Sequence, residues 1–505
     1  MRFNFILTAA GLALSMAAEV LGKPVVIGYY PSWKRAQMAG VDYSKYTHVN
    51  LAFGIPTSSG TFSFDGDWFL PQTVTDIHSK GAKALLSVGG WTGSNFFSNI
   101  VKNAGSRSTM ISSMVNYVKT NNLDGIDIDW EYPGRLGNNC NVYDITNDTP
   151  NFLTFLKELR AAFDSNFGSR QKLITLAVRI EPFDTPSGYA SDVSEFAKVV
   201  DYANLMQYDI NGGWNADTGP NAPFNFESGK GLQASFVSAI DAWTGSGWPA
   251  NQLTAGIAFY GRSTIAKGDM TKDPNNQYQP QESVVPLGDS EDASWYDACA
   301  GSTANSGVWM WKHLRDQGVL PSTSTAAAPW VRQWDPVSQT PWLFNPSTKQ
   351  FISYDDPQSL KIKVDYAASK GLAGTMIWSM NMDYNGELMN VIQSWQTGGP
   401  STSTPTTPTS STTKTTNTMP ATSTKTTTAT SSVPQPSTTS TGGNTGGGPV
   451  AGGSCSSTGS YQCADTTGRN PAYFLCLYGK WMTQSCGSGT ACYQSGSSVS
   501  CGWPS

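Results

Sequence analysis

The chain has 505 residues, too many for one ordinary domain and enough for a large buried core. Its formal net charge is −5 and only 14% of its residues are charged, which disfavours nucleic acid or an anionic membrane surface as a partner. Its three histidines, His48, His78 and His313, are scattered without a ligand pattern, so we expect no metal and no cofactor.

Residues 1–22 have the pattern of a secretory signal peptide. A positively charged start precedes an apolar run from Phe5 to Ala18, and residues 20–22 offer permissive positions for cleavage. The run is too short to span a bilayer, and no later segment qualifies. The sequence therefore predicts a secreted, extracellular protein whose mature chain begins at Lys23, with cleavage after Ala18 as the alternative.

Residues 23–396 alternate buried-type strands with amphipathic helical patterns. The expected strands are Val25–Tyr29, Thr47–Phe53, Ala84–Val88, Ile126–Trp130, Leu173–Val178, Tyr202–Met206, Leu253–Phe259 and Gly374–Trp378. Eight strand–helix units over roughly 370 residues fit a TIM (β/α)8 barrel, a fold of the α/β class. A doubly wound open sheet is the alternative, which is disfavoured because no glycine-rich phosphate loop follows the first strand.

Three further segments depart from the strand–helix pattern. The gap between the last two strands is longer than one crossover needs, so we expect an inserted domain at about residues 263–350, rich in Trp and Tyr. Residues 397–453 are almost entirely Ser, Thr, Pro and Gly and predict an extended, O-glycosylated linker. Residues 454–505 are cysteine-rich and predict a small disulfide-bonded module.

The most informative stretch is 124–133, which reads DGIDIDWEYP. Because a strand alternates its faces, three acids share one face and large apolar side chains share the other; the acids are Asp127, Asp129 and Glu131. On a barrel strand the apolar face packs on the outer helices, and the acids line a site at the carboxyl end. Crowded acids raise each other's pKa, so one can stay protonated and act as a general acid. A divalent-cation site or a solvated acidic turn that includes Asp124 is the alternative.

Four motifs at strand ends give the barrel segment a family resemblance. They are residues 87–91 (SVGGW), the acid strand 124–131, residues 206–209 (MQYD) and Trp378. Together they resemble glycoside hydrolase family 18, the chitinases, and especially the secreted fungal type. The insertion is similar to the small α+β insertion domain of that family, which walls a deep cleft. The cysteine-rich tail is similar to a family 19 chitin-binding module.

The resemblance implies a substrate-assisted mechanism for the acids. Glu131 would protonate the glycosidic oxygen and later deprotonate the attacking water, while the acetamido oxygen of the substrate attacks the anomeric carbon and the configuration is retained. Asp129 would hold the acetamido N–H and offset the developing positive charge. Asp127 and Ser87 would lie behind it as a reservoir of protons and hydrogen bonds.

The resemblance also implies substrate contacts around the acids. Tyr208 would donate to the acetamido carbonyl with help from Asp209, and Trp378 would form the apolar floor under the sugar. The remaining family-matched positions are Tyr29, Trp33, Trp91, Tyr132, Met206, Trp214 and Arg262. Four of these match family positions that line the barrel mouth: Tyr29, Trp33, Trp91 and Trp214. For each of the four, the alternative is a ring that is buried and serves only packing. We expect exposure for the three tryptophans, which lie in Gly- and Ser-containing loops, and leave Tyr29 open.

Cysteines and a sequon add further expectations. The tail carries six cysteines, which imply three disulfides with fifteen possible pairings: Cys455, Cys463, Cys476, Cys486, Cys492 and Cys501. Its candidate binding face consists of Trp481 and Trp503. In the barrel segment, Cys140 and Cys299 are hypothesised to bridge across the cleft. Asn147 begins an N-glycosylation sequon, weakened by the following Pro150.

The function that the family resemblance implies is a secreted, monomeric chitinase that hydrolyses β-1,4 bonds between N-acetylglucosamine units, with chitin and chitooligosaccharides as partners. A non-catalytic chitin lectin is one alternative, since such barrels can lose the acid and keep the cleft, but Glu131 is present. An endo-β-N-acetylglucosaminidase acting on N-glycans is another, which the chitin-binding tail and the walled cleft disfavour.

Overall fold

The structure is a computed structural model, and it describes residues 23–397 and parts of the segment 453–502. The described parts of that segment are 453–455, 461–464, 470, 472–477, 480–485, 491–495 and 498–502. The expected signal peptide and nearly all of the expected linker lie outside the described residues, as do Cys486 and Trp503.

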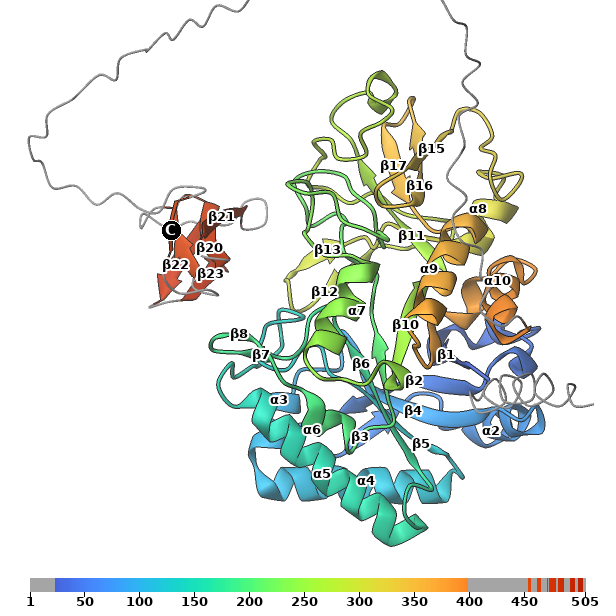
Figure 1. Ribbon diagram of the computed structural model, residues 1–505, viewed down its shortest axis with the longest axis vertical. Coiled ribbons are helices and arrows are strands. Elements are labelled where there is room, and N and C mark those ends of the chain that lie inside the picture. Colours follow the sequence, from blue (N-terminus) through green and yellow to red (C-terminus); the bar gives the residue numbers. More distant parts are fainter. Residues whose placement is uncertain are drawn as a thin grey trace, which may run out of the picture.

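Within residues 23–397, eight parallel strands close into a barrel (Figure 1). They are β1 (Val25–Pro31), β2 (His48–Pro56), β4 (Lys83–Gly89), β5 (Gly125–Asp129), β6 (Leu173–Val178), β9 (Tyr202–Leu205), β10 (Leu253–Ala258) and β18 (Gly374–Trp378). Each strand pairs with the next, and β1 pairs with both β2 and β18, which closes the ring. The predicted TIM barrel is confirmed. A short strand, β3 (Phe62–Phe64), adds to β2 in antiparallel orientation.

Helices connect the strands on the outside of the barrel. The principal ones are α2 (Leu70–Ser79), α3 (Phe97–Lys102), α4 (Ala104–Thr120), α5 (Asp148–Phe167), α6 (Ser194–Ala197), α7 (Phe236–Gly245), α9 (Pro357–Ser369) and α10 (Glu387–Thr397). Local signals set their starts: the Asn103 side chain caps α4, and Asp356 caps α9 just before its first-turn Pro357. No helix in the described part of the chain has both the length and the apolar character of a membrane span.

The core lies between the strands and these helices. On β5, Ile126 and Ile128 are fully buried on the outer face, and Trp130 just beyond the strand stacks on Phe97 with ring centroids 5.3 Å apart. The residues of opposite parity on β5 therefore face the barrel interior. This alternation brings Asp127 and Asp129 inside, as the sequence predicted.

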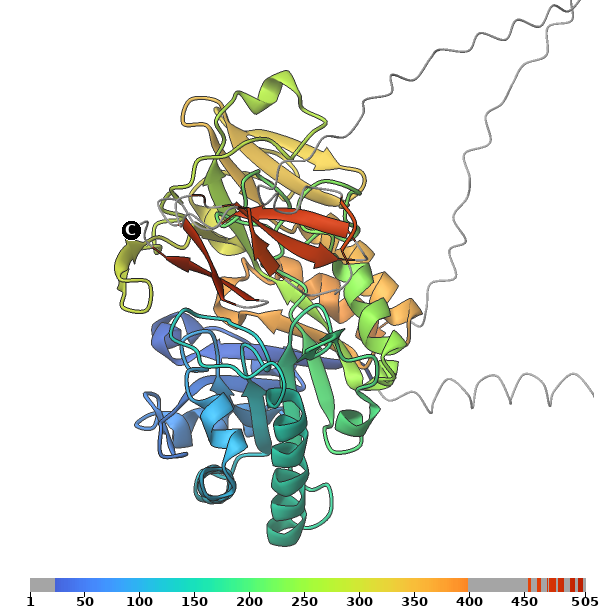
Figure 2. The same cartoon turned by 90° about the vertical axis from the view of Figure 1, so that its left-hand side faces the viewer.

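The insertion is a second α+β unit that follows β10. Its antiparallel sheet has the order β14 (Val308–Met310), β11 (Tyr260–Ile265), β17 (Gln350–Ser353), β16 (Thr340–Asn345) and β15 (Val331–Asp335). The helix α8 (Trp311–Asp316) and a hairpin of β12 (Trp295–Asp297) and β13 (Ser302–Ala304) complete it. Because β11 begins just after β10 ends, the sheet stands over the carboxyl ends of the barrel strands (Figures 1 and 2).

The described part of the C-terminal segment is all β. The strands β19 (Tyr461–Cys463), β20 (Ala472–Leu477) and β21 (Lys480–Ser485) form one sheet, and β22 (Ala491–Ser495) pairs with β23 (Ser498–Gly502). Among its described side chains, disulfides link Cys455 to Cys476 and Cys463 to Cys492, and the third predicted disulfide would involve residues outside them. Trp481 lies on β21 and is half-buried.

Candidate active site

The acids lie where β4 and β5 end side by side. Ser87 pairs in register with Asp127, and Gly89 pairs with Asp129. Gly89 has a φ of +118°, and a Cβ there would come within 2.1 Å of the Asp129 carbonyl oxygen. Only glycine allows the two strands to approach this closely, which explains the first glycine of the SVGGW motif, Gly89.

Asp127 is the anchored member of the acid series. Four side chains from four strands donate to its carboxylate: Tyr29 Oη and Ser87 Oγ at 2.7 Å to Oδ2, Thr175 Oγ1 at 2.5 Å and Asn204 Nδ2 at 3.2 Å to Oδ1. Burial raises the pKa of Asp127, and these hydrogen bonds counteract part of that rise because they stabilise the ionised form.

Asp129 is equally buried but poorly satisfied. Its Oδ1 has no hydrogen-bond partner among the described residues. Burial, followed by the negative charges of Glu131 and Asp127, raises the pKa of Asp129 well above its usual range. The protonated carboxyl is therefore favoured, and one buried oxygen is available to a ligand.

Glu131 follows β5 and is the most accessible of the three acids. It is half-buried, its backbone N–H donates to Ser94 Oγ at 2.9 Å, and its carbonyl oxygen accepts from Asn141 Nδ2 at 2.7 Å. Burial raises the pKa of Glu131 to about 7; the charge of Asp209 adds to the rise, and hydrogen bonding from Tyr132 opposes it. A carboxyl group with this pKa can both give and take a proton near neutral pH.

The MQYD motif supplies the opposite side of the site. The Tyr208 hydroxyl is 3.5 Å from Met376 Sδ, and burial raises the pKa of Tyr208 well above its usual range, so the phenol stays protonated. The charge of Asp209 adds to the rise in the pKa of Tyr208, and its expected help to Tyr208 in substrate binding stays a prediction. Its carboxylate accepts from Tyr260 Oη at 2.7 Å and from both Arg262 Nε at 2.7 Å and Nη2 at 2.5 Å, a bidentate pair that fixes it.

Trp378 at the end of β18 belongs to an aromatic group over the barrel mouth. It is half-buried and stacks on Phe53 with ring centroids 5.7 Å apart and planes 13° apart. Trp33 lies beside both rings, at 5.9 Å from Phe53 and 6.5 Å from Trp378. Non-proline cis peptide bonds precede Phe53 and Tyr132 and follow Trp378.

The three tryptophans expected at the mouth are exposed. Their exposed fractions are 55% for Trp33, 49% for Trp91 and 58% for Trp214, and the Arg262 guanidinium lies 5.3 Å from the Trp214 ring centroid. Tyr29, which the sequence left open between a mouth ring and a buried ring, is 1% exposed, because its position on β1 turns it into the interior where its hydroxyl reaches Asp127. Met206 packs partly buried against the same interior cluster.

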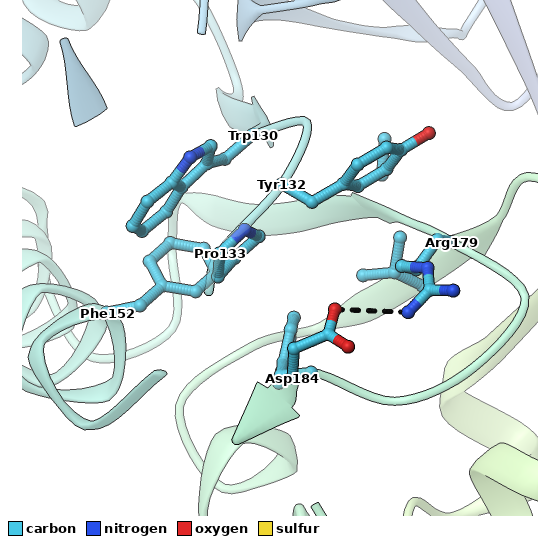
Figure 3. Close-up of a pocket in the computed structure, with 9 residues that line it drawn as sticks. Trp130, Tyr132, Pro133, Phe152, Arg179 and Asp184 are labelled. Atoms are coloured by element: carbon cyan, nitrogen blue, oxygen red, sulfur yellow. Dashed lines mark hydrogen bonds and ion pairs between the residues drawn. The ribbon is translucent and has the colours of Figure 1, made fainter. Parts of the chain in front are cut away.

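A small recess lies beside Tyr132. It is lined by Trp130, Tyr132, Pro133, Phe152, Ala177, Val178, Arg179, Phe183 and Asp184. Figure 3 shows Trp130 and Phe152 at one side and the Arg179–Asp184 ion pair, with an N–O distance of 3.1 Å, at another. Its lining includes none of the three acids and meets the acid site only at Tyr132, which hydrogen-bonds to Glu131.

Several residues of the site were not found from the sequence. Thr175 and Asn204, which donate to Asp127, and Phe53 lie on strands that were identified correctly, whereas Tyr260 begins β11, a strand that was not predicted. The alternation of side chains along a strand could have placed Thr175 and Asn204 in the barrel interior, but no motif marks either residue.

The remaining sequence expectations have mixed outcomes. The Cys140–Cys299 disulfide is formed, which confirms the hypothesised bond. Asn147 is exposed at the start of α5, where its Nδ2 donates to Asp144 at 2.8 Å, and its glycosylation stays a prediction. Asp124 lies apart from the other acids and contacts His78 Nε2 at 2.7 Å. No group of three or more His, Cys, Asp or Glu in the described residues could hold a metal ion.

Comparison with known proteins agrees with this geometry. The model of the family described as "Glycosyl hydrolases family 18" matches residues 25–383. The chain belongs to this family. A "chitinase-like effector" of Moniliophthora roreri is 34% identical, over 77% of this chain and 97% of the relative. "Chitinase A1" of Niallia circulans is 28% identical, over 76% of this chain and 60% of the relative.

Solved structures of family members are also similar. A chitinase from Rhizomucor miehei matches with a TM-score of 0.67 and 33% identity, covering 74% of this chain and all of that one. The Ostrinia furnacalis Group IV chitinase in complex with allosamidin matches with a TM-score of 0.62 and 28% identity, covering 74% of this chain and 98% of that one. The family match ends at residue 383, so the cysteine-rich tail lies outside it.

Proposed function

We propose that this protein is a chitinase that hydrolyses the β-1,4 bonds of chitin and of chitooligosaccharides with retention of configuration. The observation that carries the proposal is the graded acid series of β5. Asp127 is anchored, Asp129 is buried with an unpartnered oxygen, and Glu131 is accessible with a pKa raised to about 7. This arrangement supplies one proton-transfer group next to one charge-stabilising group.

Glu131 acts twice in the proposed reaction. It donates its proton to the glycosidic oxygen while the acetamido carbonyl oxygen of the same sugar attacks the anomeric carbon, so the bond to the leaving chain breaks and an oxazolinium ion forms. The Glu131 carboxylate then takes a proton from water, whose oxygen attacks the anomeric carbon from the side of the departed chain. Two inversions give net retention, and Glu131 is protonated again.

The neighbouring residues position the acetamido group. Asp129 accepts the acetamido N–H through its available oxygen. The positive charge of the ring that forms favours the ionised state of Asp129, whose proton passes to Asp127 behind it. Among the described residues the phenol of Tyr208 reaches only the weak acceptor Met376 Sδ, so it can donate to the acetamido oxygen. Trp378 provides a flat apolar surface beneath the sugar, and Trp33, Trp91 and Trp214 provide further rings for neighbouring sugars. Ser87, Tyr132, Met206 and Arg262 complete the set of proposed substrate-contacting or positioning residues.

A second candidate function is chitin binding without hydrolysis. It is favoured by the name of the Moniliophthora roreri relative, a "chitinase-like effector", which does not state an activity. The intact acid series supports hydrolysis instead. An endo-β-N-acetylglucosaminidase that acts on N-glycans is a third candidate, since it would use the same acetamido chemistry.

The organisation of the whole chain is part of the proposal. Residues 1–22 would direct secretion, 23–396 form the hydrolytic domain, 397–453 serve as a spacer and 454–505 bind chitin through Trp481 and Trp503. The resulting extracellular enzyme would act as a monomer. Disulfides in both the barrel and the tail support an oxidising compartment.

The test is a comparison of three substrates with the purified full chain. A hexamer of N-acetylglucosamine should be cleaved, whereas a glucose hexamer without acetamido groups and a high-mannose glycoprotein should not. Binding of the N-acetylglucosamine hexamer without cleavage would support the chitin-binding function. Release of glycan from the glycoprotein, with the hexamer untouched, would support the N-glycan-cleaving function.

A further inference from the structure

The Cys140–Cys299 disulfide joins two segments that both rise from the carboxyl-end face of the barrel. Cys140 lies in the loop 134–147 between Glu131 and α5, and Cys299 lies in the turn of the β12–β13 hairpin of the insertion. The bond connects residues 159 apart in sequence. Figure 1 shows the β12–β13 hairpin between the insertion sheet and the barrel. We call the loop 134–147, the hairpin 295–304 and their disulfide the strap.

One end of the strap is fixed directly to the acid site. The side chain of Asn141, next to Cys140, donates to the Glu131 carbonyl oxygen at 2.7 Å. Gly137 lies so close that a Cβ there would be 2.0 Å from the same oxygen. The loop therefore packs on the backbone of the proposed acid.

The other end is fixed to the opposite side of the site. After β13, the carbonyl oxygen of Ser306 accepts from Arg262 Nη1 at 3.0 Å. The same guanidinium holds Asp209, which directly follows Tyr208. A continuous series of bonds and contacts thus leads from Glu131 through the disulfide and the hairpin to Arg262 and Asp209. The neighbouring strands β5, β6 and β9 connect its two ends beneath, and we call the closed path the circuit.

The strap carries exposed aromatic side chains. Trp295 and Tyr296 on β12 are 45% and 68% exposed, and Tyr143 in the loop is 45% exposed. Because neighbouring residues of a strand face opposite ways, Trp295 and Tyr296 lie on opposite faces of the hairpin, so each is a separate candidate for contact with a ligand beneath it. Aromatic rings stack on the apolar faces of sugars, whereas a purely structural hairpin has no need of two exposed rings.

We propose that the strap passes over a bound chitin chain at the proposed acid and retains it. A chain enclosed by the circuit must slide out lengthwise, whereas an open site would let it lift away. Release of a long chain should therefore be slow, and a short oligomer, which has little length to withdraw, should be affected far less. This role rests on the proposed function, because its ligand is the chitin chain.

The experiment compares release rates from the full-length protein in the Glu131→Gln background, which leaves the ligand uncut. The strap is opened by the double substitution Cys140→Ser/Cys299→Ser, and its rings are removed one at a time, Trp295→Ala and Tyr296→Ala, with the disulfide kept. Stopped-flow fluorescence follows the release of a hexamer and of a dimer of N-acetylglucosamine. We expect the opened strap to release the hexamer about tenfold faster and the dimer less than about twofold faster.

The ring variants keep the proposal testable if the double variant fails to fold, which its thermal unfolding would reveal. One of the two, Trp295→Ala or Tyr296→Ala, should also speed hexamer release severalfold. Equal hexamer release from the fastened, opened and ring-deleted proteins would overturn the strap's role. Failure of the wild-type protein to cleave a hexamer that it binds would overturn the proposed hydrolysis and leave the strap's role standing. Failure to bind the hexamer would overturn both.

Discussion

Asp127 and Asp129 enter the barrel interior from the same strand, yet only Asp127 is saturated with hydrogen bonds. Asp127 accepts from four side chains, whereas Oδ1 of Asp129 has no partner among the described residues. An unpaired buried oxygen is unfavourable, so it favours any ligand that can supply a donor. The first acid is therefore built as a fixed support and the second as a binding group.

The pH dependence of hydrolysis should report the raised pKa of Glu131. The proposed reaction starts with Glu131 protonated, and burial raises its pKa from 4.5 to about 7. We expect kcat/KM for a chitooligosaccharide to fall as the pH rises through about 7, rather than through the ordinary range of a glutamate near pH 4.5. A pH–rate profile between about pH 4 and pH 9 checks this. A fall in kcat/KM near pH 4.5, the ordinary pKa of a glutamate, would contradict the raised pKa of Glu131.

Asp209→Asn should move the expected fall in kcat/KM to lower pH. The negative charge of Asp209 contributes to the raised pKa of Glu131, so its removal lowers that pKa and leaves Arg262 without its partner, which acts in the same direction. The matched control is Asp241→Asn, which removes the same charge from the exposed face of α7. An equal shift in both variants would mean that overall charge, rather than the local pair, sets the pH at which kcat/KM falls.

Asp129→Asn should stabilise the protein while it weakens hydrolysis. A carboxyl group whose pKa is raised by folding contributes most stability below its unfolded pKa of about 3.9, and that contribution is lost as the pH rises through the raised value. An uncharged amide does not suffer this loss. The thermal midpoint of the variant should therefore exceed that of the wild type by about 2 °C or more at pH 8, and by less at pH 4. If the thermal midpoints of variant and wild type differed by the same amount at both pH values, the cost of ionising a buried Asp129 could not be the cause.

The barrel and the acid strand could be read from the sequence because their signals are local. Apolar runs of strand length located all eight strands, and simple alternation placed Asp127 and Asp129 inside and Ile126 and Ile128 outside. The exposure of Trp33 also followed from its position in a loop after a strand.

The contacts around the acids could not be read in the same way, because they depend on register between strands far apart in sequence. Tyr29, Thr175 and Asn204 meet at Asp127 only because β1, β6 and β9 converge at one level of the barrel. For the same reason the sequence could not decide whether Tyr29 is exposed at the mouth or buried. The Arg262 pair with Asp209 was missed because it joins a barrel loop to the insertion.

The anomeric form of the first product should be β. Attack by the substrate's own acetamido oxygen followed by attack of water inverts the anomeric centre twice. NMR spectra recorded early in the hydrolysis of an N-acetylglucosamine hexamer, before mutarotation, distinguish the anomers. An initial α-anomer would indicate a single displacement by water and would exclude the proposed role of Asp129 and Tyr208 on the acetamido group.

Removal of the chain after Thr397, where α10 ends, should affect solid and soluble substrates differently. A tethered binding module raises the local concentration of enzyme on a solid surface but adds nothing to a soluble oligomer already in the site. Activity on insoluble chitin should fall severalfold, and kcat/KM for a soluble hexamer should stay within about twofold. Equal losses on both substrates would mean that the tail supports the barrel itself.

The most direct test of the whole account is the turnover of an N-acetylglucosamine hexamer by the wild-type protein and by Glu131→Gln, with binding of the hexamer measured in parallel. General acid–base catalysis alone contributes about 10²–10⁴-fold, and here one residue serves both steps. We expect the wild-type protein to cleave the hexamer and the variant to lose at least that factor in kcat while its affinity stays within about threefold. Near-normal turnover by the variant, or a wild-type protein that binds the hexamer and leaves it intact, would contradict the account.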